Sequence, residues 1–444
     1  MQKKLNKKAG EVSRRDFIKT SAAVSMAAML SGTGKIFAAG SDKMRVGVIG
    51  CGGRGSGAAL DCIKSSEGVE IVAIGELFKD RLDKGIDQIK EKLVEEKLPA
   101  EKLKVTEETC FVGFDAYQKV VACDFVDMVI IATPPHFRPI HLKAAIEAGK
   151  HVFMEKPVAV GPGGIRSIIA TSEIAEQKGL AIVAGTQRQH QEHYLEIIRR
   201  IHKGDIGEIV AAQCYWNMEG LWIEAAKDNL INKEKLGWSD MEYQIRNWLF
   251  LVWLSGDHIV EQHVHNIDVV NWAIGSHPIQ AMGVGGREVR TGPEYGNIFD
   301  HFAIEFEYPN GARVLSMCRQ TEGCNRQVSE RVIGTKGSSY TDGSVGYIEG
   351  QNAYKFEGES PNPYVQEHTD LIASIRGGNP LNEGRRVAES TMTAIMGRMS
   401  AYTGRALSWD WVMNASKLDL SPPKYEFGDL PMRPVAVPGK TKLV

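Results

Sequence analysis

Residues 44–57 constrain the fold more than any other part of this 444-residue chain. They read M-R-V-G-V-I-G-C-G-G-R-G-S-G, so a short, largely apolar strand leads directly into G-x-G-x-x-G. In this pattern Gly50 makes the tight turn, Gly52 lets the backbone approach a diphosphate, and Gly55 allows the next helix to pack closely. That helix, expected at about 56–64, would direct its N–H groups and positive dipole end at the diphosphate. The motif therefore predicts a dinucleotide-binding βαβ unit.

A carboxylate follows the second expected strand of this unit. Residues 69–75 read V-E-I-V-A-I-G and lead into Glu76. A carboxylate at this position accepts hydrogen bonds from an adenosine ribose. It would also repel a 2′-phosphate, which favours NAD over NADP, although Lys79 and Arg81 nearby weaken that preference. The alternative for the whole stretch is a glycine-rich turn in an ordinary α/β protein.

Length and composition narrow the class of protein. The chain exceeds one ordinary domain, so two domains are the natural expectation. A hydrophobic fraction of 43% with 24% charged residues is typical of a globular protein, and a formal net charge of −2 argues against nucleic acid as a partner. The seven cysteines include no C-x-x-C pair, so they form neither a zinc nor a disulfide framework.

The N-terminus resembles an export signal. Residues 13–19 read S-R-R-D-F-I-K and precede a mildly apolar run at 20–30, with small residues suited to cleavage near 38–40. The run is shorter than the roughly 20 residues of a membrane span, so no stable membrane anchor is expected. We expect residues 1–40 to engage the twin-arginine translocation machinery and the protein to be periplasmic or otherwise exported. A chance basic, amphipathic start is the alternative.

Such an export route has a consequence for the chemistry. The twin-arginine pathway carries folded proteins, so a nucleotide would be loaded in the cytoplasm and exported with the protein. Free nicotinamide cofactor is scarce outside the cytoplasm. A bound nucleotide that one substrate has reduced must therefore be re-oxidised in place, either by a second substrate or by the same substrate taking the hydride back.

Further strand ends are expected to meet the glycine-rich turn. Residues 125–132, F-V-D-M-V-I-I-A, read as a buried parallel strand that ends in T-P-P-H at 133–136. Residues 151–154 form another short strand, which delivers E-K-P at 155–157, and G-T-Q-R-Q-H-Q at 185–191 is a third strand end. Because ligands gather at the carboxyl ends of parallel strands, we expect these segments in one cleft.

These motifs together resemble one known family, that of glucose–fructose oxidoreductase, inositol dehydrogenase and the rhizopine catabolism protein (Gfo/Idh/MocA). The segments that carry the resemblance run in family order along nearly the whole mature chain: V-G-V-I-G-C-G-G-R-G (46–55), A-T-P-P-H (132–136), A-G-K-H-V-F-M-E-K-P (148–157), E-Q-H-V-H-N-I-D (261–268), E-H-T-D-L-I-A-S-I-R-G-G (367–378) and A-Y-T-G (401–404).

The resemblance implies an α/β fold in two domains. We expect an N-terminal Rossmann domain at 43–160, with a doubly wound parallel sheet. A C-terminal α+β domain at 161–420 would bear substrate contacts on an open, mostly antiparallel sheet, with helix 382–403 returning toward the first domain. Residues 421–444 would be an extended tail. Because the family often associates through the second sheet, the resemblance also implies a homo-oligomer.

Catalytic roles are assigned to the E-K-P tip and to residues 257–268. Resemblance makes Lys156 the lysine beside the nicotinamide, and an ammonium there can bond the reacting hydroxyl. If 257–268 is one helix, Glu261 and His265 share a face and His263 points about 200° away. The family pattern D-x-G-x-H-x-x-D maps His265 onto the active-site histidine. Glu261 replaces the usual Asp and His263 the usual Gly, which puts the role of Glu261 in doubt.

The expected site follows from these assignments. His265 is the general base, Lys156 assists it, and Glu261 orients the base or contacts the sugar. The expected cofactor contacts are Gly50, Gly52, Gly53, Arg54, Gly55, Glu76, Thr133, Pro134, His136, Glu155, Lys156 and Gln187. The expected substrate contacts are Arg188, Arg246, Trp248 and His263.

The histidine-rich segment 257–268 could have two other roles, as a metal site or as structural side chains. The role of the tryptophans is also open. His258, Glu261 and His265 could ligate a metal from one helix face, but hydride transfer in the family needs none, so we expect no metal. The three side chains could also be structural. Five of the eight tryptophans lie between residues 216 and 253. They either fill the core or cover the apolar faces of a sugar.

Three functions remain open from the sequence. The first is an exported NAD-dependent oxidoreductase that moves a hydride between a sugar ring carbon, such as C3, and a tightly bound nicotinamide. The second is a redox-neutral glycosidase that oxidises, eliminates, hydrates and re-reduces. Against it, such family members lack the E-K-P motif. The third is a nucleotide-bearing binding protein without activity, which would predict loss of Lys156 or His265. The sequence does not identify the sugar, anomer or acceptor.

Overall fold

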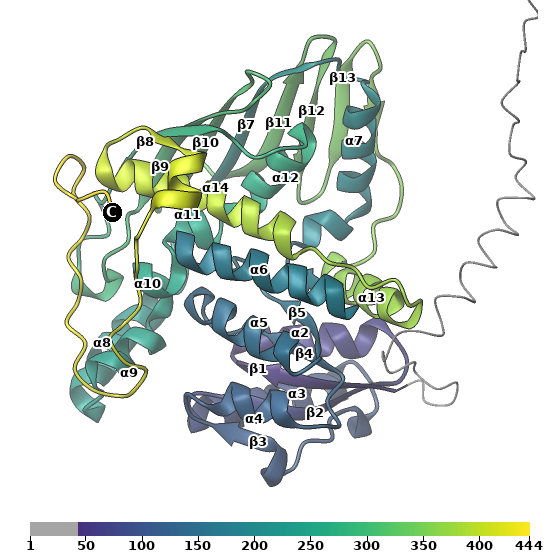
Figure 1. The fold of residues 1–444 in the computed structure, drawn as a ribbon, viewed down its shortest axis with the longest axis vertical. Coiled ribbons are helices and arrows are strands. Elements are labelled where there is room, and N and C mark those ends of the chain that lie inside the picture. Colours follow the sequence, from purple (N-terminus) through teal and green to yellow (C-terminus); the bar gives the residue numbers. More distant parts are fainter. Residues whose placement is uncertain (1–42) are drawn as a thin grey trace, which may run out of the picture. The chain divides into compact units, whose positions relative to one another are not determined.

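The computed structural model describes residues 43–444, so the expected signal segment lies outside the described part. The first sheet has six parallel strands in the order β3-β2-β1-β4-β5-β6 (Figure 1). Their bounds are β1 Met44–Ile49, β2 Val69–Glu76, β3 Cys110–Val112, β4 Met128–Ile131, β5 His151–Met154 and β6 Ile182–Ala184. The strand order reverses between β1 and β4, the position at which open α/β sheets bind ligands. β6 lies beyond the expected domain boundary at residue 160, because the chain returns through a further helix to the sheet edge.

Helices cover both faces of this sheet. They are α2 Gly53–Ser65, α3 Lys79–Glu95, α4 Ala116–Ala122, α5 Arg138–Glu147 and α6 Pro162–Lys178. A distant helix, α13 (Pro363–Arg376), also packs against α2 and places Leu371 and Ile372 in the same apolar cluster as Val46 and Val48 of β1. The central strands are apolar on both sides because both sides are covered.

The second sheet has nine strands in the order β14-β13-β12-β11-β7-β10-β9-β8-β15. Their bounds are β7 Ile209–Met218, β8 Gln280–Gly286, β9 His301–Glu307, β10 Arg313–Gln320, β11 Gln327–Gly334, β12 Gly337–Asp342, β13 Gly346–Gly350, β14 Tyr354–Lys355 and β15 Leu407–Ser408. Within the described chain, β7 and β10 are its one parallel pair. The expected mostly antiparallel sheet is thus confirmed.

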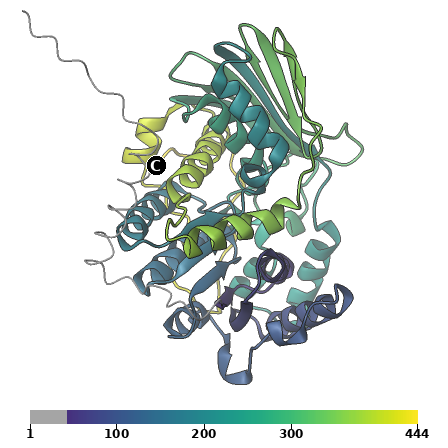
Figure 2. The same cartoon turned by 90° about the vertical axis from the view of Figure 1, so that its right-hand side faces the viewer.

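One face of the second sheet is covered by helices α7 Glu192–Lys203, α12 Val264–Ile274 and α14 Gly384–Thr403. In Figure 2 these helices lie to one side of the green strands. Strand β9 shows the consequence, because Phe302, Ile304 and Phe306 are buried while the residues between them are not. Such alternation is typical of a sheet with one covered face.

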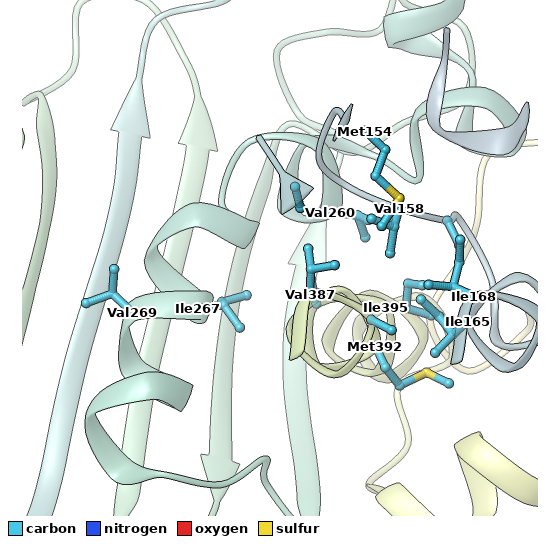
Figure 3. Packing of buried hydrophobic residues seen from close by; sticks show 14 of the residues in the cluster. Met154, Val158, Ile165, Ile168, Val260, Ile267, Val269, Val387, Met392 and Ile395 are labelled. Carbon is cyan, nitrogen blue, oxygen red and sulfur yellow. The ribbon is translucent and has the colours of Figure 1, made fainter. Parts of the chain in front are cut away.

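Helix α14 joins the two sheet layers. It contacts α6 of the first layer as well as α12 and β8 of the second. Figure 3 shows Val387, Met392 and Ile395 of α14 among apolar side chains from the segment after β5, from α6 and from α12. The α14 side chains are part of a continuous core, so the two sheets are held in one compact unit.

An inserted helical segment lies between β7 and β8. It comprises α8 Ile223–Leu236, α9 Asp240–Arg246, α10 Val252–Ser255 and α11 His258–Glu261. After a short π-helical turn at Trp411–Ala415, residues 416–444 contain neither helix nor strand. In the part of the chain that is described, no helix is both long and apolar enough to cross a membrane.

Candidate active site

The glycine-rich turn between β1 and α2 is tightly built. Gly50 has φ of +86°, a left-handed value that favours glycine, and a Cβ there would lie 2.9 Å from the backbone nitrogen of Thr133. A Cβ on Gly55 would lie 1.9 Å from the carbonyl oxygen of Gly50. A Cβ on Gly52 or Gly53 would meet no described atom within 4 Å. The backbone therefore leaves open space at the amino end of α2, the cradle that a diphosphate requires.

This open space belongs to a cavity of about 370 Å³ at the carboxyl ends of the parallel strands. Most of the expected residues line it: Gly50, Gly52, Gly53, Arg54, Gly55, Glu76, Thr133, Pro134, Glu155, Lys156, Trp248 and Glu261. The expected residues that do not line it are His136, Gln187, Arg188, Arg246, His263 and His265. The open glycines and the carboxylate of Glu76 fit a dinucleotide.

Glu76 is fixed at the end of β2. One oxygen accepts a hydrogen bond from the backbone N–H of Cys51 at 3.0 Å, and the other from that of Leu77 at 2.8 Å. The carboxylate therefore faces the glycine-rich turn, where a ribose hydroxyl can reach it. The nearby guanidinium of Arg81 donates to the carbonyl oxygen of Arg246 at 3.2 Å.

Arg246 is placed away from the cavity, contrary to its expected role as a substrate contact. Its guanidinium makes two 2.9 Å hydrogen bonds to Asp80 and one of 2.9 Å to Glu242. It also lies 3.9 Å above the ring of Phe78. Because its guanidinium binds Asp80 of α3, Arg246 ties α3 to α9, the helix that carries Arg246 and Glu242.

The reactive end of the cavity is formed by Lys156 and Glu261. Lys156 Nζ donates to Glu261 Oε1 at 2.8 Å, across 105 residues of sequence. Their side chains are 14% and 13% exposed, so the ion pair is largely shielded from water. Arg54 Nε donates to Glu155 Oε1 at 2.5 Å, and Arg138 donates to the carbonyl oxygen of Pro157. The E-K-P tip is therefore held on both sides.

The expected single helix over 257–268 is interrupted. Helix α11 ends at Glu261 and α12 begins at Val264, so Glu261 and His265 do not share one continuous helical face. The side chains at the break explain it. His263 Nε2 is hydrogen-bonded to Ser316 Oγ at 2.8 Å, and Gln262 Oε1 accepts from Gln320. These contacts bury His263 against the second sheet. His263 therefore does not line the cavity, where it was expected to contact the substrate.

His265 lies behind the cavity wall. Its ring stacks on that of Trp216 at 5.8 Å between centroids, and Trp216 lines the cavity. Among residues 43–444, His265 Nδ1 has no hydrogen-bond partner. Burial, reinforced by the cations of Lys156, Arg188 and Arg54, holds the pKa of His265 well below its usual range. Burial therefore favours the neutral form of this imidazole.

Three other expected residues are engaged elsewhere. Arg188 is buried in a 2.8 Å ion pair with Glu330. Gln187 Nε2 donates to the hydroxyl of Tyr364 at 3.3 Å. His136 Nε2 is hydrogen-bonded to the hydroxyl of Tyr425 at 2.8 Å, and burial lowers its pKa to about 4. These side chains support the walls of the cavity from outside.

The structure adds Gln262 to the cavity, a residue that the sequence did not single out. Arg290 can only donate hydrogen bonds, and it donates to Gln320 Oε1. Gln320 Nε2 in turn donates to Gln262 Oε1. This relay leaves Gln262 Nε2 as a donor for another acceptor. In the sequence, the only sign that Gln262 contacts substrate is its position next to Glu261. The relay itself joins three segments that are far apart in the chain, so no local pattern predicts it.

The opposite wall of the cavity is apolar and comes from the inserted helices. It consists of Leu221, Trp222, Ile245, Trp248 and Leu249. The rings of Trp222 and Trp248 meet edge to face at 5.8 Å between centroids. Trp222 is 56% exposed and has φ of +56°, an uncommon value for a residue other than glycine. Exposed aromatic faces of this kind suit the C–H faces of a sugar.

No group of three or more His, Cys, Asp or Glu side chains in residues 43–444 is arranged to hold a metal ion. The sequence raised His258, Glu261 and His265 as possible metal ligands. The helix break lies between Glu261 and His265, and both side chains interact with other residues. Glu261 pairs with Lys156, and His265 stacks on Trp216.

The fold and the cavity define a class, that of proteins with a dinucleotide-binding Rossmann domain. Comparison with family models gives the particular family. Residues 44–186 match the oxidoreductase family with an NAD-binding Rossmann fold, GFO_IDH_MocA, and residues 194–340 match the GFO/IDH/MocA C-terminal domain. The chain belongs to the Gfo/Idh/MocA family, which confirms the resemblance drawn from its motifs. Residues 11–31 match a twin-arginine signal sequence, which indicates export by that pathway.

Relatives of the chain act on sugars and cyclitols. It is similar to 2,7-anhydro-N-acetylneuraminate hydratase of Escherichia coli (strain K12), with 26% identity over 61% of this chain and 65% of that protein. It is similar to scyllo-inositol 2-dehydrogenase (NAD(+)) of Bacillus subtilis (strain 168), with 24% identity over 67% and 73%. The aldose-aldose oxidoreductase of Caulobacter crescentus has the same fold, with a TM-score of 0.63, 17% identity, and 82% and 99% of the two chains covered.

Proposed function

We propose that this protein is an exported, NAD-dependent oxidoreductase that moves a hydride between a ring carbon of a sugar or glycoside, such as C3, and a tightly bound nicotinamide. The single observation that carries the proposal is the ion pair between Lys156 and Glu261, 2.8 Å long, in the same cavity as the glycine cradle. A cation at that end of the cavity can bind the oxygen atom of the carbon that is oxidised.

Each residue of the site has a separate role in the proposed reaction. The nicotinamide ring, when bound, supplies the acceptor for the hydride. Lys156 Nζ, oriented by Glu261, donates a hydrogen bond to the substrate oxygen. We assign the hydroxyl proton to His265, which adjoins the cavity through its stacked neighbour Trp216 and whose Nδ1 has no hydrogen-bond partner within residues 43–444. Gln262 Nε2 donates to a second substrate oxygen. The apolar wall that contains Trp222 and Trp248 covers the apolar face of the sugar ring.

The position of Glu76 supports NAD over NADP. The carboxylate of Glu76 lines the cavity and is fixed by the backbone N–H groups of Cys51 and Leu77. A 2′-phosphate near it would meet a negative charge. The guanidinium of Arg81 also lines the cavity and opposes this preference, but one of its N–H groups is engaged by the backbone carbonyl oxygen of Arg246 at 3.2 Å.

The export signal supports a closed redox cycle. Because the protein leaves the compartment that regenerates free cofactor, the nucleotide would have to stay bound and be re-oxidised by a second carbonyl substrate. A second candidate is a reaction without net redox change, in which oxidation at one carbon enables elimination and hydration before re-reduction. The similarity to a hydratase supports this second candidate, because its reaction includes a hydration step.

One experiment separates these functions. The protein is purified without added cofactor, its nicotinamide absorbance is recorded, and it is incubated with a panel of glycosides with and without a carbonyl acceptor. A keto-sugar that forms only with the acceptor supports the oxidoreductase. Free sugar or a hydrated product without net redox supports the second candidate. A protein that neither carries nor binds a nicotinamide nucleotide would overturn both.

A further inference from the structure

The C-terminal tail approaches the cavity from outside. In Figure 1 the yellow chain leaves the second domain and passes beside α8 and α9. Residues 425–430 of this tail, called the strap from here on, contact elements from both walls of the cavity. Each contact involves a side chain or backbone group next to residues that line the cavity, so the strap is a structural part of the site.

The strap first contacts the ribose end of the cavity, which Glu76 marks. The ring of Phe427 lies 5.8 Å from that of Phe78 and 5.2 Å from that of Phe114, measured between centroids. Phe78 and Phe114 both line the cavity. Phe427 therefore backs two aromatic side chains on loops that follow neighbouring parallel strands.

A second contact holds the turn after β4. The hydroxyl of Tyr425 is hydrogen-bonded to His136 Nε2 at 2.8 Å, and its ring lies 5.8 Å from that of Phe137. Phe137 and the preceding Pro134 line the cavity. The strap thus also fixes the wall that lies on the far side of the strand-order reversal.

A third set of contacts ties the strap to the inserted helices. The backbone N–H of Met241 donates to the carbonyl oxygen of Gly428 at 3.1 Å, and Gln244 Nε2 donates to that of Leu430 at 2.6 Å. The backbone N–H of Leu430 donates to Asp240 Oδ2 at 3.2 Å. These residues belong to α9, whose Ile245 lines the opposite wall.

We propose that the strap closes the ribose end of the dinucleotide site and slows release of the cofactor, with Phe427 as the main positioning residue. The inference rests on the proposed function only in requiring a dinucleotide in this cavity. The two walls belong to different parts of the chain, and the strap is bonded to both. No strap residue lines the cavity itself, so the strap acts by holding the lining side chains of Phe78, Phe114 and Phe137 in place. Loosening these side chains would lower the barrier for dissociation of the dinucleotide and leave hydride transfer unchanged.

The test measures the dissociation of NADH. The protein is stripped of nucleotide and reloaded with NADH, an excess of NAD⁺ is added, and the loss of bound NADH fluorescence gives the dissociation rate. We expect Phe427→Ala to raise this rate about tenfold or more, Phe427→Leu to raise it less, and Tyr425→Phe to raise it by a smaller factor. Met432→Ala changes a side chain of the same tail outside residues 425–430 and of similar exposure to Phe427 (41% against 47%), so it should leave the rate unchanged.

The outcomes are separable. A rate for Phe427→Ala equal to that of the parent would overturn the strap while leaving the proposed function intact. An equal rise for Met432→Ala would also overturn it, because the effect would then be a general loosening of the tail. Failure of the parent to bind NADH or NADPH would overturn both proposals. Thermal unfolding of each stripped variant checks that the fold is retained. If Phe427→Ala does not fold, the rates of Phe427→Leu and Tyr425→Phe decide, and parental rates for both would overturn the strap.

Discussion

The two ends of the cavity are built in different ways. At the diphosphate end, the work is done by backbone conformation within a few residues, since Gly50 needs a left-handed φ and Gly55 needs the absence of a Cβ. At the reactive end, side chains from distant segments meet, such as Lys156 and Glu261 across 105 residues of sequence. The first end is a local property of the chain, whereas the second exists only once both sheets have packed together.

This difference separates affinity from reactivity. A defect in the glycine-rich turn should weaken cofactor binding and leave the reactive side chains in place. A defect at the reactive end should do the opposite. Substitutions at one end that leave the other unchanged would sharpen the distinction, and substitutions that affect both ends equally would break it.

The largest effect is expected from Lys156→Ala. Loss of the cation removes the hydrogen bond to the reacting oxygen and leaves Glu261 without its partner, so we expect turnover to fall by about 10²- to 10⁴-fold. Nucleotide that copurifies with the protein should remain. Steady-state rates and the absorbance of bound cofactor give the two readouts. Rates like those of the parent would remove Lys156 from the mechanism, and Lys143→Ala, an exposed lysine on α5, is the control.

The converse is expected from Gly55→Ala. Its Cβ would lie 1.9 Å from the carbonyl oxygen of Gly50, so the turn has to shift. We expect cofactor binding to weaken about 10- to 100-fold. The matched control is Gly57→Ala on the same helix, where the added Cβ would meet a described atom only at 4.0 Å. Titration with NADH measures both variants, and equal affinities would contradict the close-packing role of Gly55.

A third prediction concerns the layer behind the diphosphate end, where α13 buries His368 against Phe153 with ring centroids 4.0 Å apart. Burial lowers the pKa of His368 to about 3. The unfolded chain binds a proton below about pH 6.5 and the folded chain does not, so stability falls as the pH drops below that value. At about pH 5 this single group accounts for about 2 kcal/mol.

His368→Phe removes that group while keeping a ring in place. Urea unfolding of the parent and of the variant should show the loss of stability between about pH 7 and about pH 5 shrinking by about 2 kcal/mol in the variant. The neighbouring Glu367 acts in the opposite direction, because burial and Glu155 raise its pKa well above the usual range. It is common to both proteins and cancels in the difference. An unchanged pH dependence would show that His368 is not neutral in the folded state.

The smallest effect is expected from Gln262→Leu. The change removes one hydrogen bond to the substrate and leaves the amide of Gln320 without its acceptor, so we expect KM to rise about tenfold with a smaller change in kcat. Gln320→Leu should act in the same direction, since it frees Gln262 to rotate. A purely structural Gln262 would lower the unfolding temperature without moving KM.

The diphosphate end could be proposed from the sequence because each residue there acts through a local rule. The glycine spacing, the strand before it and Glu76 are all contained in residues 44–76. The E-K-P tip was also placed correctly at a strand end, because the apolar strand before it is short and clear. The two-sheet architecture followed from the resemblance and was confirmed.

The reactive end was harder because packing decided it. Arg188 and Arg246 were expected at the substrate, but carboxylates that are distant in the sequence, Glu330 and Asp80, hold them elsewhere. The break after Glu261 follows from side-chain bonds to the second sheet, which helical periodicity cannot reveal. The relay to Gln262 depends on three segments meeting, so no local pattern contains it.

The ion pair between Lys156 and Glu261 forms only when the two domains are packed together, so each charge is neutralised only in that arrangement. One partner stands at the tip of the parallel sheet, and the other ends a helix of the inserted segment. If the domains moved apart by the width of a water molecule, each would become a bare ion beside the nucleotide. Solvent would then reach the ammonium just when a substrate could also enter, so ligand exchange and electrostatic exposure would occur in the same motion.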